Sequence, residues 1–164
     1  FDFMGNTDEG INSYLDGNSV QSPSYSRTEA TEDLNISEII IRNMMGKQCD
    51  EFMINDDVYI HCKIGIPDID FDKYSFHIQV LDATKQPVFA KEIRISKREI
   101  TLKIHKHFLT PGKYSVTGII YIPAIQQFEK IEDVCVFRIV DSGSEFSHLG
   151  SFNYGTVFGK AEWI

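Results

Sequence analysis

A set of polar and aromatic side chains has the types and spacing needed to bind a sugar. The set consists of Tyr59, His61, Lys63, Tyr121, His77, Gln79 and Arg138. The first three alternate with apolar neighbours, and Tyr121 is expected to project in the same way from its own strand. The last three do so on what is expected to be the other sheet. Sugars offer an apolar C–H face for ring stacking and hydroxyls for planar hydrogen-bonding groups, so this set suits a neutral glycan. By itself, the pattern favours the simpler interpretation that these side chains cover a solvated sheet.

Two further groups contain residues that could bind metal ions. His105 and His107 lie two positions apart and would share one face of a strand, but no third ligand is identifiable nearby. The D-x-D-x-D run at 68–72 has the spacing of a calcium loop. However, Lys73 stands where that loop needs glycine, and no Glu occupies its twelfth position. We interpret the histidines as solvated strand-end residues and the aspartates as a charged hairpin connection, and we expect no metal.

No motif of a familiar catalytic class is present. Gly112 and Lys113 are followed by Tyr114 rather than Ser or Thr, so the phosphate-binding loop of ATPases is absent. Neither G-x-S-x-G nor H-E-x-x-H occurs, and no pair of carboxylates can be assigned to one face of a groove. The sequence therefore predicts a non-catalytic protein without a cofactor.

The composition limits the possible partners and the redox setting. The chain has 164 residues, a formal net charge of -8 and a pI near 5.0, so its surface repels nucleic-acid phosphates and anionic lipid headgroups. No apolar run is long enough to cross a membrane. Cys49, Cys62 and Cys135 form no C-x-x-C pair, and an odd number cannot pair completely within one chain. We expect free thiols in a reducing, cytosolic setting, with Cys62 and Cys135 acting as small hydrophobic residues within strands.

From Ile36 onward, the hydrophobic pattern has the period of two that is typical of strands. It recurs in the segments 36–43, 57–65, 74–82, 87–95, 99–105, 114–122 and 134–140. Thr110-Pro111-Gly112-Lys113 is a turn signal before one of them. Short strands at regular spacing predict an all-β fold, an antiparallel β-sandwich of immunoglobulin-like type. A β-barrel is the alternative.

The two ends of the chain differ from this middle part. Residues 6–15 carry a cap residue, early acids and a short apolar stripe, which predicts a short helix, and residues 16–32 have the composition of a linker. Because the chain begins at Phe1 rather than Met, we expect a piece of a longer protein. Residues 1–33 would end an upstream domain, and residues 34–164 would form the β-sandwich. The alternative is a frayed helix followed by a disordered arm.

Near the other end, a Gly-rich segment, 143–159, follows the last predicted strand. The only tryptophan, Trp163, comes next to last in the chain. Tryptophan is costly to leave in water, so this end should pack on its own sandwich or reach a partner subunit.

The order of several motifs resembles a known family. These motifs are Phe52, Asp56-Asp57, the strand 76–82, Leu109-Thr110-Pro111-Gly112-Lys113-Tyr114, Phe137 to Asp141, and Gly155 to Trp163. On them, residues 34–164 resemble the C-terminal carbohydrate-binding domain of Wzt-type ATPases, the nucleotide-binding subunits of ABC transporters that export O-antigen polysaccharide. Residues 7–15 resemble the last helix of the ATPase domain that precedes it.

The resemblance implies a cytoplasmic module at the inner face of the bacterial inner membrane. Such a module recognises the exported O-antigen glycan, often at its modified non-reducing end. It also implies a homodimer with exchange of the C-terminal strand, for which Phe158 and Trp163 are the candidate contacts, and a link to the transporter membrane subunit through the upstream ATPase domain. The alternative function is an immunoglobulin-like dimerisation or adaptor domain with a protein partner.

Overall fold

The computed structural model describes residues 22–29, 31, 33–65, 71–141, 143–144, 147–149 and 155–158 of the chain. These residues form strands joined by loops and by two short 3-10 helices, η1 (Phe71–Lys73) and η2 (Ser147–Leu149). The strands are β1 (Ser24–Ser26), β2 (Asn35–Arg42), β3 (Glu51–Met53), β4 (Val58–Gly65), β5 (Ser75–Leu81), β6 (Pro87–Arg94), β7 (Glu99–Ile104), β8 (Gly112–Ile122) and β9 (Gln126–Val140). The helix expected near the N-terminus lies outside the described residues.

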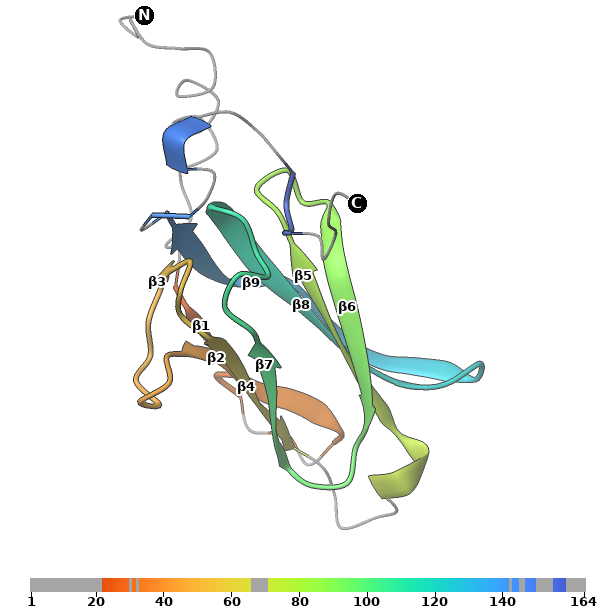
Figure 1. The fold of residues 1–164 in the computed structure, drawn as a ribbon. Coiled ribbons are helices and arrows are strands. Elements are labelled where there is room, and N and C mark those ends of the chain that lie inside the picture. The colour runs from red at the N-terminus through yellow and green to blue at the C-terminus, as the bar shows by residue number, and fades with distance from the viewer. Residues whose placement is uncertain are drawn as a thin grey trace, which may run out of the picture.

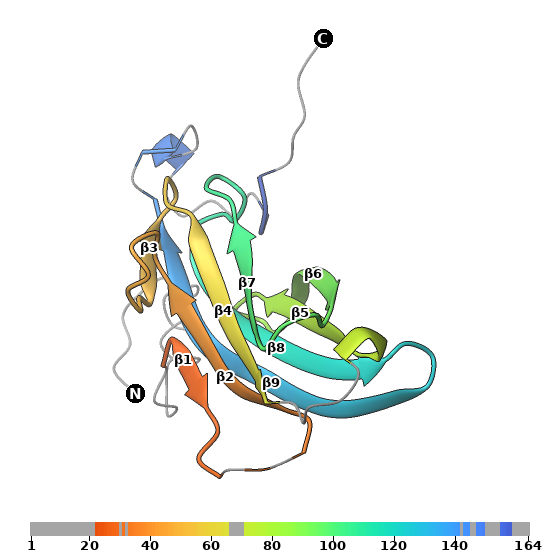
Figure 2. The same cartoon turned by 90° about the horizontal axis from the view of Figure 1, so that it is seen from below.

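The strands build two sheets that pack face to face (Figures 1 and 2). One sheet has the order β1-β2-β4-β7, and the other has the order β3-β9-β8-β5-β6. Neighbouring strands run antiparallel except for β3, which pairs in parallel with the end of β9. The immunoglobulin-like sandwich predicted from the sequence is therefore confirmed, with one short parallel strand added at an edge.

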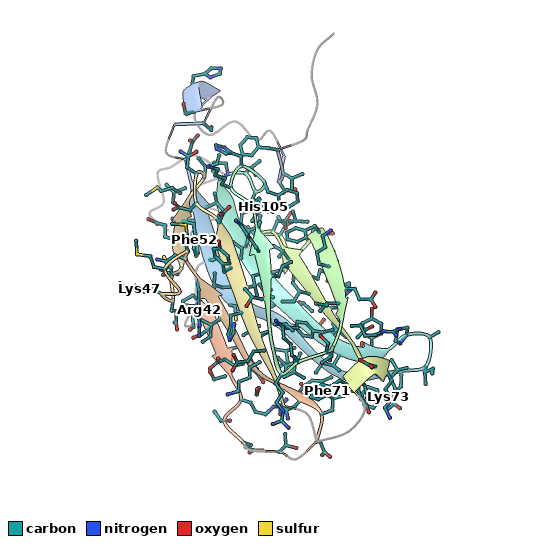
Figure 3. The ribbon with its side chains drawn as sticks, turned by 60° about the horizontal axis from the view of Figure 1, so that its bottom comes forward. Arg42, Lys47, Phe52, Phe71, Lys73 and His105 are labelled. Atoms are coloured by element: carbon teal, nitrogen blue, oxygen red, sulfur yellow. The ribbon has the colours of Figure 1, made fainter. Side chains whose placement is uncertain are left out.

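Alternation along the strands produces the core between the sheets. In β4, Val58, Ile60, Cys62 and Ile64 are buried, whereas the residues between them are at least partly exposed. Isoleucine dominates the interior, and β-branched side chains suit the pleated surface of a strand. The largest fully buried side chains are Phe52, Phe137, Ile36, Ile39, Ile41, Ile54, Ile60, Ile64, Ile95, Ile120, Val58 and Val80. Figure 3 shows Phe52 among the side chains between the sheets.

All seven predicted strands are present, and six of them match the observed bounds within two residues. The exception is β9, which begins at Gln126 instead of residue 134. Its first half pairs with β8 in a hairpin that projects beyond the rest of the sandwich (Figures 1 and 2). Most side chains of this half are exposed and its pairing with β8 is irregular, so no regular apolar alternation reveals it in the sequence.

Two short strands were not expected, and both lie at sheet edges. β1 falls within the stretch predicted to be a linker, yet Ser24, Tyr25 and Ser26 pair with β2. β3 holds only three residues, too few for an alternating pattern to show. Among the described residues, no helix is long and apolar enough to cross a membrane.

Candidate functional site

The strand register places several of the predicted binding residues on the outer face of β5 and β8. Tyr121 of β8 stands opposite Ser75 of β5, Ile119 stands opposite His77, and Thr117 stands opposite Gln79. Opposed residues in an antiparallel pair point to the same side of the sheet. The alternate residues of β5 are buried in the core, so this side faces outward. We call it the β5–β8 outer face.

A shallow, open depression of about 390 Å³ lies on this face and extends to the tip of the β8–β9 hairpin. We call it the hairpin pocket. Its lining residues are His77, Ile119, Tyr121, Ile122, Ala124, Ile125, Gln126 and Gln127. Its volume falls within the usual range for small-ligand sites, roughly 300–1,000 Å³. The structure thus brings Tyr121 and His77 into one pocket, with Gln79 one position further along β5 on the same face.

The hairpin that forms this pocket is fixed at its tip and at its base. At the tip, Ala124 has a positive φ of 59° and Ile125 donates a backbone hydrogen bond to the Ile122 carbonyl at 3.1 Å. At the base, the ring of Phe128 meets Tyr74 edge-on, with centroids 5.3 Å apart. The Glu129 carboxylate accepts the Ile36 backbone N–H, which ties β9 to the opposite sheet. These contacts therefore fix the hairpin against the rest of the sandwich.

A negative charge beside the pocket comes from Glu92 of β6, which stands opposite His77. The hydroxyls of Ser75 and Tyr121 both donate hydrogen bonds to the Glu92 carboxylate. These bonds, the one from Ser75 first, lower the pKa of Glu92, so the carboxylate is ionised at neutral pH. Partial burial, together with the bond to Glu92, raises the pKa of Tyr121. The Tyr121 hydroxyl is thus neutral and held in one direction.

Apart from His77 and Tyr121, the residues that line the pocket were not predicted from the sequence, and neither was Glu92 beside it. Glu92 lies in a predicted strand, but it attracts attention only once β6 is known to border β5. The two glutamines precede the predicted start of the last strand, and Pro123, just before them, was the available signal for a turn.

Tyr59, His61 and Lys63 lie on the opposite side of the molecule, on the outer face of β2, β4 and β7. We call it the β4 outer face. Its side chains already have partners within the sheet. The Lys103 ammonium lies 5.6 Å from the centre of the Tyr59 ring and 2.7 Å from the Asp57 carboxylate, and its hydrogen bond lowers the pKa of Asp57. Nδ1 of His61 lies 3.1 Å from the Thr101 hydroxyl. Tyr121 therefore groups with His77 and Gln79 rather than with Tyr59.

Arg138 is far from the hairpin pocket. It stands opposite Lys113 near the start of β8, whereas Tyr121 is near the end of that strand. Positions 113 and 121 are separated by roughly 26 Å at about 3.3 Å per residue. The predicted set is thus divided among three places: the β5–β8 outer face with its hairpin pocket, the β4 outer face, and the part of β9 that pairs with the start of β8.

Of the two predicted dimerisation residues, the structure describes only Phe158. Trp163 lies outside the described residues. Phe158 packs against the core of its own sandwich, and its backbone N–H donates to the Phe108 carbonyl at 2.9 Å. Beside it, the buried Tyr114 hydroxyl donates to the Thr110 carbonyl at 2.8 Å and lies 3.2 Å from the Thr156 carbonyl. This tyrosine corner links the start of β8 to the segment 155–158.

The residues considered as metal ligands do not form a site in the described part of the chain. His105 and His107 are exposed in the loop after β7, at the end of the sandwich opposite η1 (Figure 3). No group of three His, Cys, Asp or Glu side chains able to hold a metal occurs among the described residues. Of the aspartate run, Asp72 lies in η1, and Asp68 and Asp70 are outside the described residues.

The cysteines are free thiols, as the sequence predicted. Cys62 and Cys135 are buried in the core, and burial raises the pKa of both, that of Cys135 to about 12. They are therefore protonated packing residues. The Cys135 thiol donates to the Ile39 carbonyl at 3.2 Å.

Comparisons with known proteins identify a fold. No protein-family model matches the chain. No curated protein matches it either. Among solved structures, the chain is similar to the crystal structure of the C-terminal domain of Wzt, with a TM-score of 0.61 and 12% sequence identity, over 86% of each chain. The β-sandwich therefore has the fold of the Wzt C-terminal domain, as the resemblance of its motifs predicted.

Proposed function

We propose that this domain is a non-catalytic glycan-binding module and that the hairpin pocket is its binding site. The observation that carries the proposal is the Tyr121 ring, held by Glu92 at a shallow pocket that also contains His77 and two glutamines. The fold similarity to the Wzt C-terminal domain and the sequence motifs support a glycan as the ligand.

Binding would combine ring stacking with hydrogen bonds. The Tyr121 hydroxyl is engaged by Glu92, so the ring is oriented before the ligand arrives. A sugar placed on it could use Gln126 and Gln127 as donors and acceptors, and His77 as either, depending on its tautomer. An open site exchanges water hydrogen bonds for protein ones with little net gain, so we expect a weak affinity, on the order of millimolar for a single sugar unit.

The lining of the pocket supports binding rather than hydrolysis. Glycoside hydrolysis generally needs two carboxyl groups that flank the scissile bond. None of the described residues that line the pocket is Asp or Glu. Glu92 lies beside the lining, and its carboxylate is occupied by the Ser75 and Tyr121 hydroxyls.

The wider role follows from the same resemblance. We propose that the glycan is the O-antigen polysaccharide, recognised in the cytoplasm for ATP-driven export by an ABC transporter. An upstream ATPase domain would connect residues 34–164 to the membrane subunit of the transporter. Two ATPase domains work as a pair, which would place two copies of this domain side by side and favour a two-fold contact that includes Phe158 and Trp163.

The test is an NMR titration of the isotope-labelled domain with the O-polysaccharide of the encoding strain, with an unrelated O-polysaccharide as the control. We expect selective shifts of amides in β5, β8 and the hairpin, and none on β4. Shifts confined to β4 and β7 would move the site to the β4 outer face. A folded sample that shifts with neither polymer would refute glycan binding.

The alternative, a dimerisation or adaptor domain, is favoured by one separate observation. Met44 and Met45, in the loop after β2, are 75% and 88% exposed, and exposed methionines are common at protein-binding surfaces. This alternative expects Met44→Ser/Met45→Ser to alter the molecular mass measured in solution by light scattering. An unchanged mass would remove the support that these residues give it.

A further inference from the structure

The hairpin pocket contains more aliphatic surface than hydroxyl-rich ligands require. Four of its eight lining residues are aliphatic: Ile119, Ile122, Ala124 and Ile125. They follow β8 and its turn, and they flank Tyr121 along the strand. The polar lining residues come from the two neighbouring strands, His77 from β5 and Gln126 and Gln127 from β9. The pocket therefore has an apolar floor between polar edges.

Ile119 stands out because of its position on the sheet. It is partly exposed on the β5–β8 outer face, where Tyr121 stands opposite Ser75 and Thr117 opposite Gln79. The side chains of Ile119 and Tyr121 are about 7 Å apart along the strand, at roughly 3.3 Å per residue. A pyranose stacked on Tyr121 therefore brings a substituent of its ring close to Ile119. At the other end of the floor, Ile125 is 77% exposed.

This floor discriminates between ring substituents. A hydroxymethyl group placed on isoleucine loses hydrogen bonds to water and gains none from the protein, which is unfavourable. A methyl group in the same place loses no hydrogen bond and buries apolar area. An acetamido group also carries a methyl, but its N–H and C=O would need polar partners that isoleucine and alanine side chains lack.

We propose that the hairpin pocket selects a 6-deoxyhexose unit of the glycan, with its pyranose ring on Tyr121, its C6 methyl against the aliphatic floor, and its hydroxyls at His77, Gln126 and Gln127. This inference rests on the proposed function, because it assigns a sugar class to the same site. It makes the aliphatic residues of β8 and its turn determinants of specificity, in addition to the polar residues at the edges.

The expected preference is modest. Both sugars of a matched pair carry the C6 carbon, so they differ in the desolvation of the C6 hydroxyl, which costs about 0.8 kcal/mol at a partly open site. At about 1.4 kcal/mol for each tenfold change, this corresponds to roughly fourfold tighter binding of the deoxy sugar.

The experiment titrates the labelled chain with methyl glycosides in matched pairs that differ only in the C6 hydroxyl. The first pair is the methyl α-glycosides of D-fucose and D-galactose, and the second is those of L-rhamnose and L-mannose. The methyl α-glycoside of N-acetyl-D-galactosamine tests the acetamido alternative. We expect the 6-deoxy member of at least one pair to bind about fourfold more tightly, with shifts at Ile119, Tyr121 and Gln127.

A pair of variants assigns the preference to the pocket. Ile119→Thr keeps a β-branched residue in the strand but replaces apolar surface with a hydroxyl, and it should abolish the difference within the sugar pair. Ile40→Thr is the matched control, because Ile40 stands opposite His61 on the other sheet as Ile119 stands opposite His77. It should leave the preference intact. Thermal unfolding checks that both variants remain folded.

The O-polysaccharide titration separates the failure of this inference from the failure of the proposed function. The inference is overturned if the hydroxylated or acetamido sugar binds as well as or better than the deoxy sugar, or if Ile119→Thr keeps the preference. It is also overturned if the polysaccharide shifts the pocket while no deoxy sugar binds. In each of these cases polysaccharide binding at the pocket would still support the proposed function, whereas its absence refutes both.

Discussion

Replacing Tyr121 with alanine tests the proposed site most directly. Tyr121→Ala removes the ring on which the sugar is expected to stack, and Glu92 loses one of its two hydroxyl donors. Because Tyr121 is partly exposed on the outer face, its loss should leave the core between the sheets intact. The variant should therefore fold and bind the glycan weakly.

The magnitude follows from the ring surface that a ligand can cover. A tyrosine side chain has roughly 200 Å² of surface, and about a quarter of it, roughly 50 Å², is open to a ligand at a partly exposed position. At about 25 cal/mol per Å², covering this area contributes about 1.2 kcal/mol. We therefore expect the Kd for the O-polysaccharide to rise about eightfold. Tyr121→Phe keeps the ring and should raise it about twofold at most, through loss of the bond to Glu92.

The matched control is Tyr59→Ala, which removes the same side chain from the β4 outer face. Tyr59 contacts the Lys103 ammonium, so its loss should lower stability by about 0.5 kcal/mol and leave the affinity unchanged. Isothermal titration calorimetry or NMR titration gives the Kd of each variant. Equal weakening by the two alanine variants, or normal binding by Tyr121→Ala, would refute the assignment of the site to the hairpin pocket.

Three further changes test how the fold supports this site. Tyr114→Phe leaves the buried Thr110 carbonyl without its 2.8 Å donor, so the free energy of unfolding measured in urea should fall by about 1–2 kcal/mol. An unchanged free energy of unfolding would show that the hydrogen bond from Tyr114 to Thr110 does not stabilise the fold. Gly118→Ala places a Cβ 3.1 Å from the fully buried Ile39 side chain and 3.2 Å from that of Ile36, so the unfolding free energy should fall by about 1–2 kcal/mol. A more stable variant would show that the two sheets can separate to make room for the added methyl group. Because the pKa of Glu92 is lowered in the folded state, its contribution to stability is present above the ordinary glutamate pKa of about 4.3 and is lost as pH falls through the lowered value. Glu92→Gln should therefore lose less stability than the wild type between pH 7 and pH 3 in thermal unfolding, and identical acid sensitivity would show that the carboxylate is not stabilised in this way.

The strands and the core were predictable from the sequence because their signal is local. Alternation of apolar and polar residues depends on the geometry of a single strand, so seven strands and the buried face of β4 could be inferred without knowing any partner. The turn before β8 was equally local, since Pro and Gly restrict or permit particular backbone angles. The same reasoning failed for the first half of β9, whose side chains are mostly exposed and show no regular apolar alternation.

The candidate site was predictable only in its residue types. Tyr121, His77 and Tyr59 all have the outward, polar positions of binding residues, and nothing in a single strand tells which sheet it will join. The pairing of β5 with both β6 and β8 brings Ser75, Glu92 and Tyr121 together, and the hairpin adds the glutamines.

The sequence by itself thus determined a β-sandwich with polar and aromatic outer faces, because the period of two along each strand is a property of the local chain. The tertiary structure alone decided that Tyr121 and His77 share a pocket while Tyr59 and Arg138 lie elsewhere. The physical reason is that strand order and register depend on contacts between residues far apart in the chain, and these contacts form only when both sheets bury their apolar faces together.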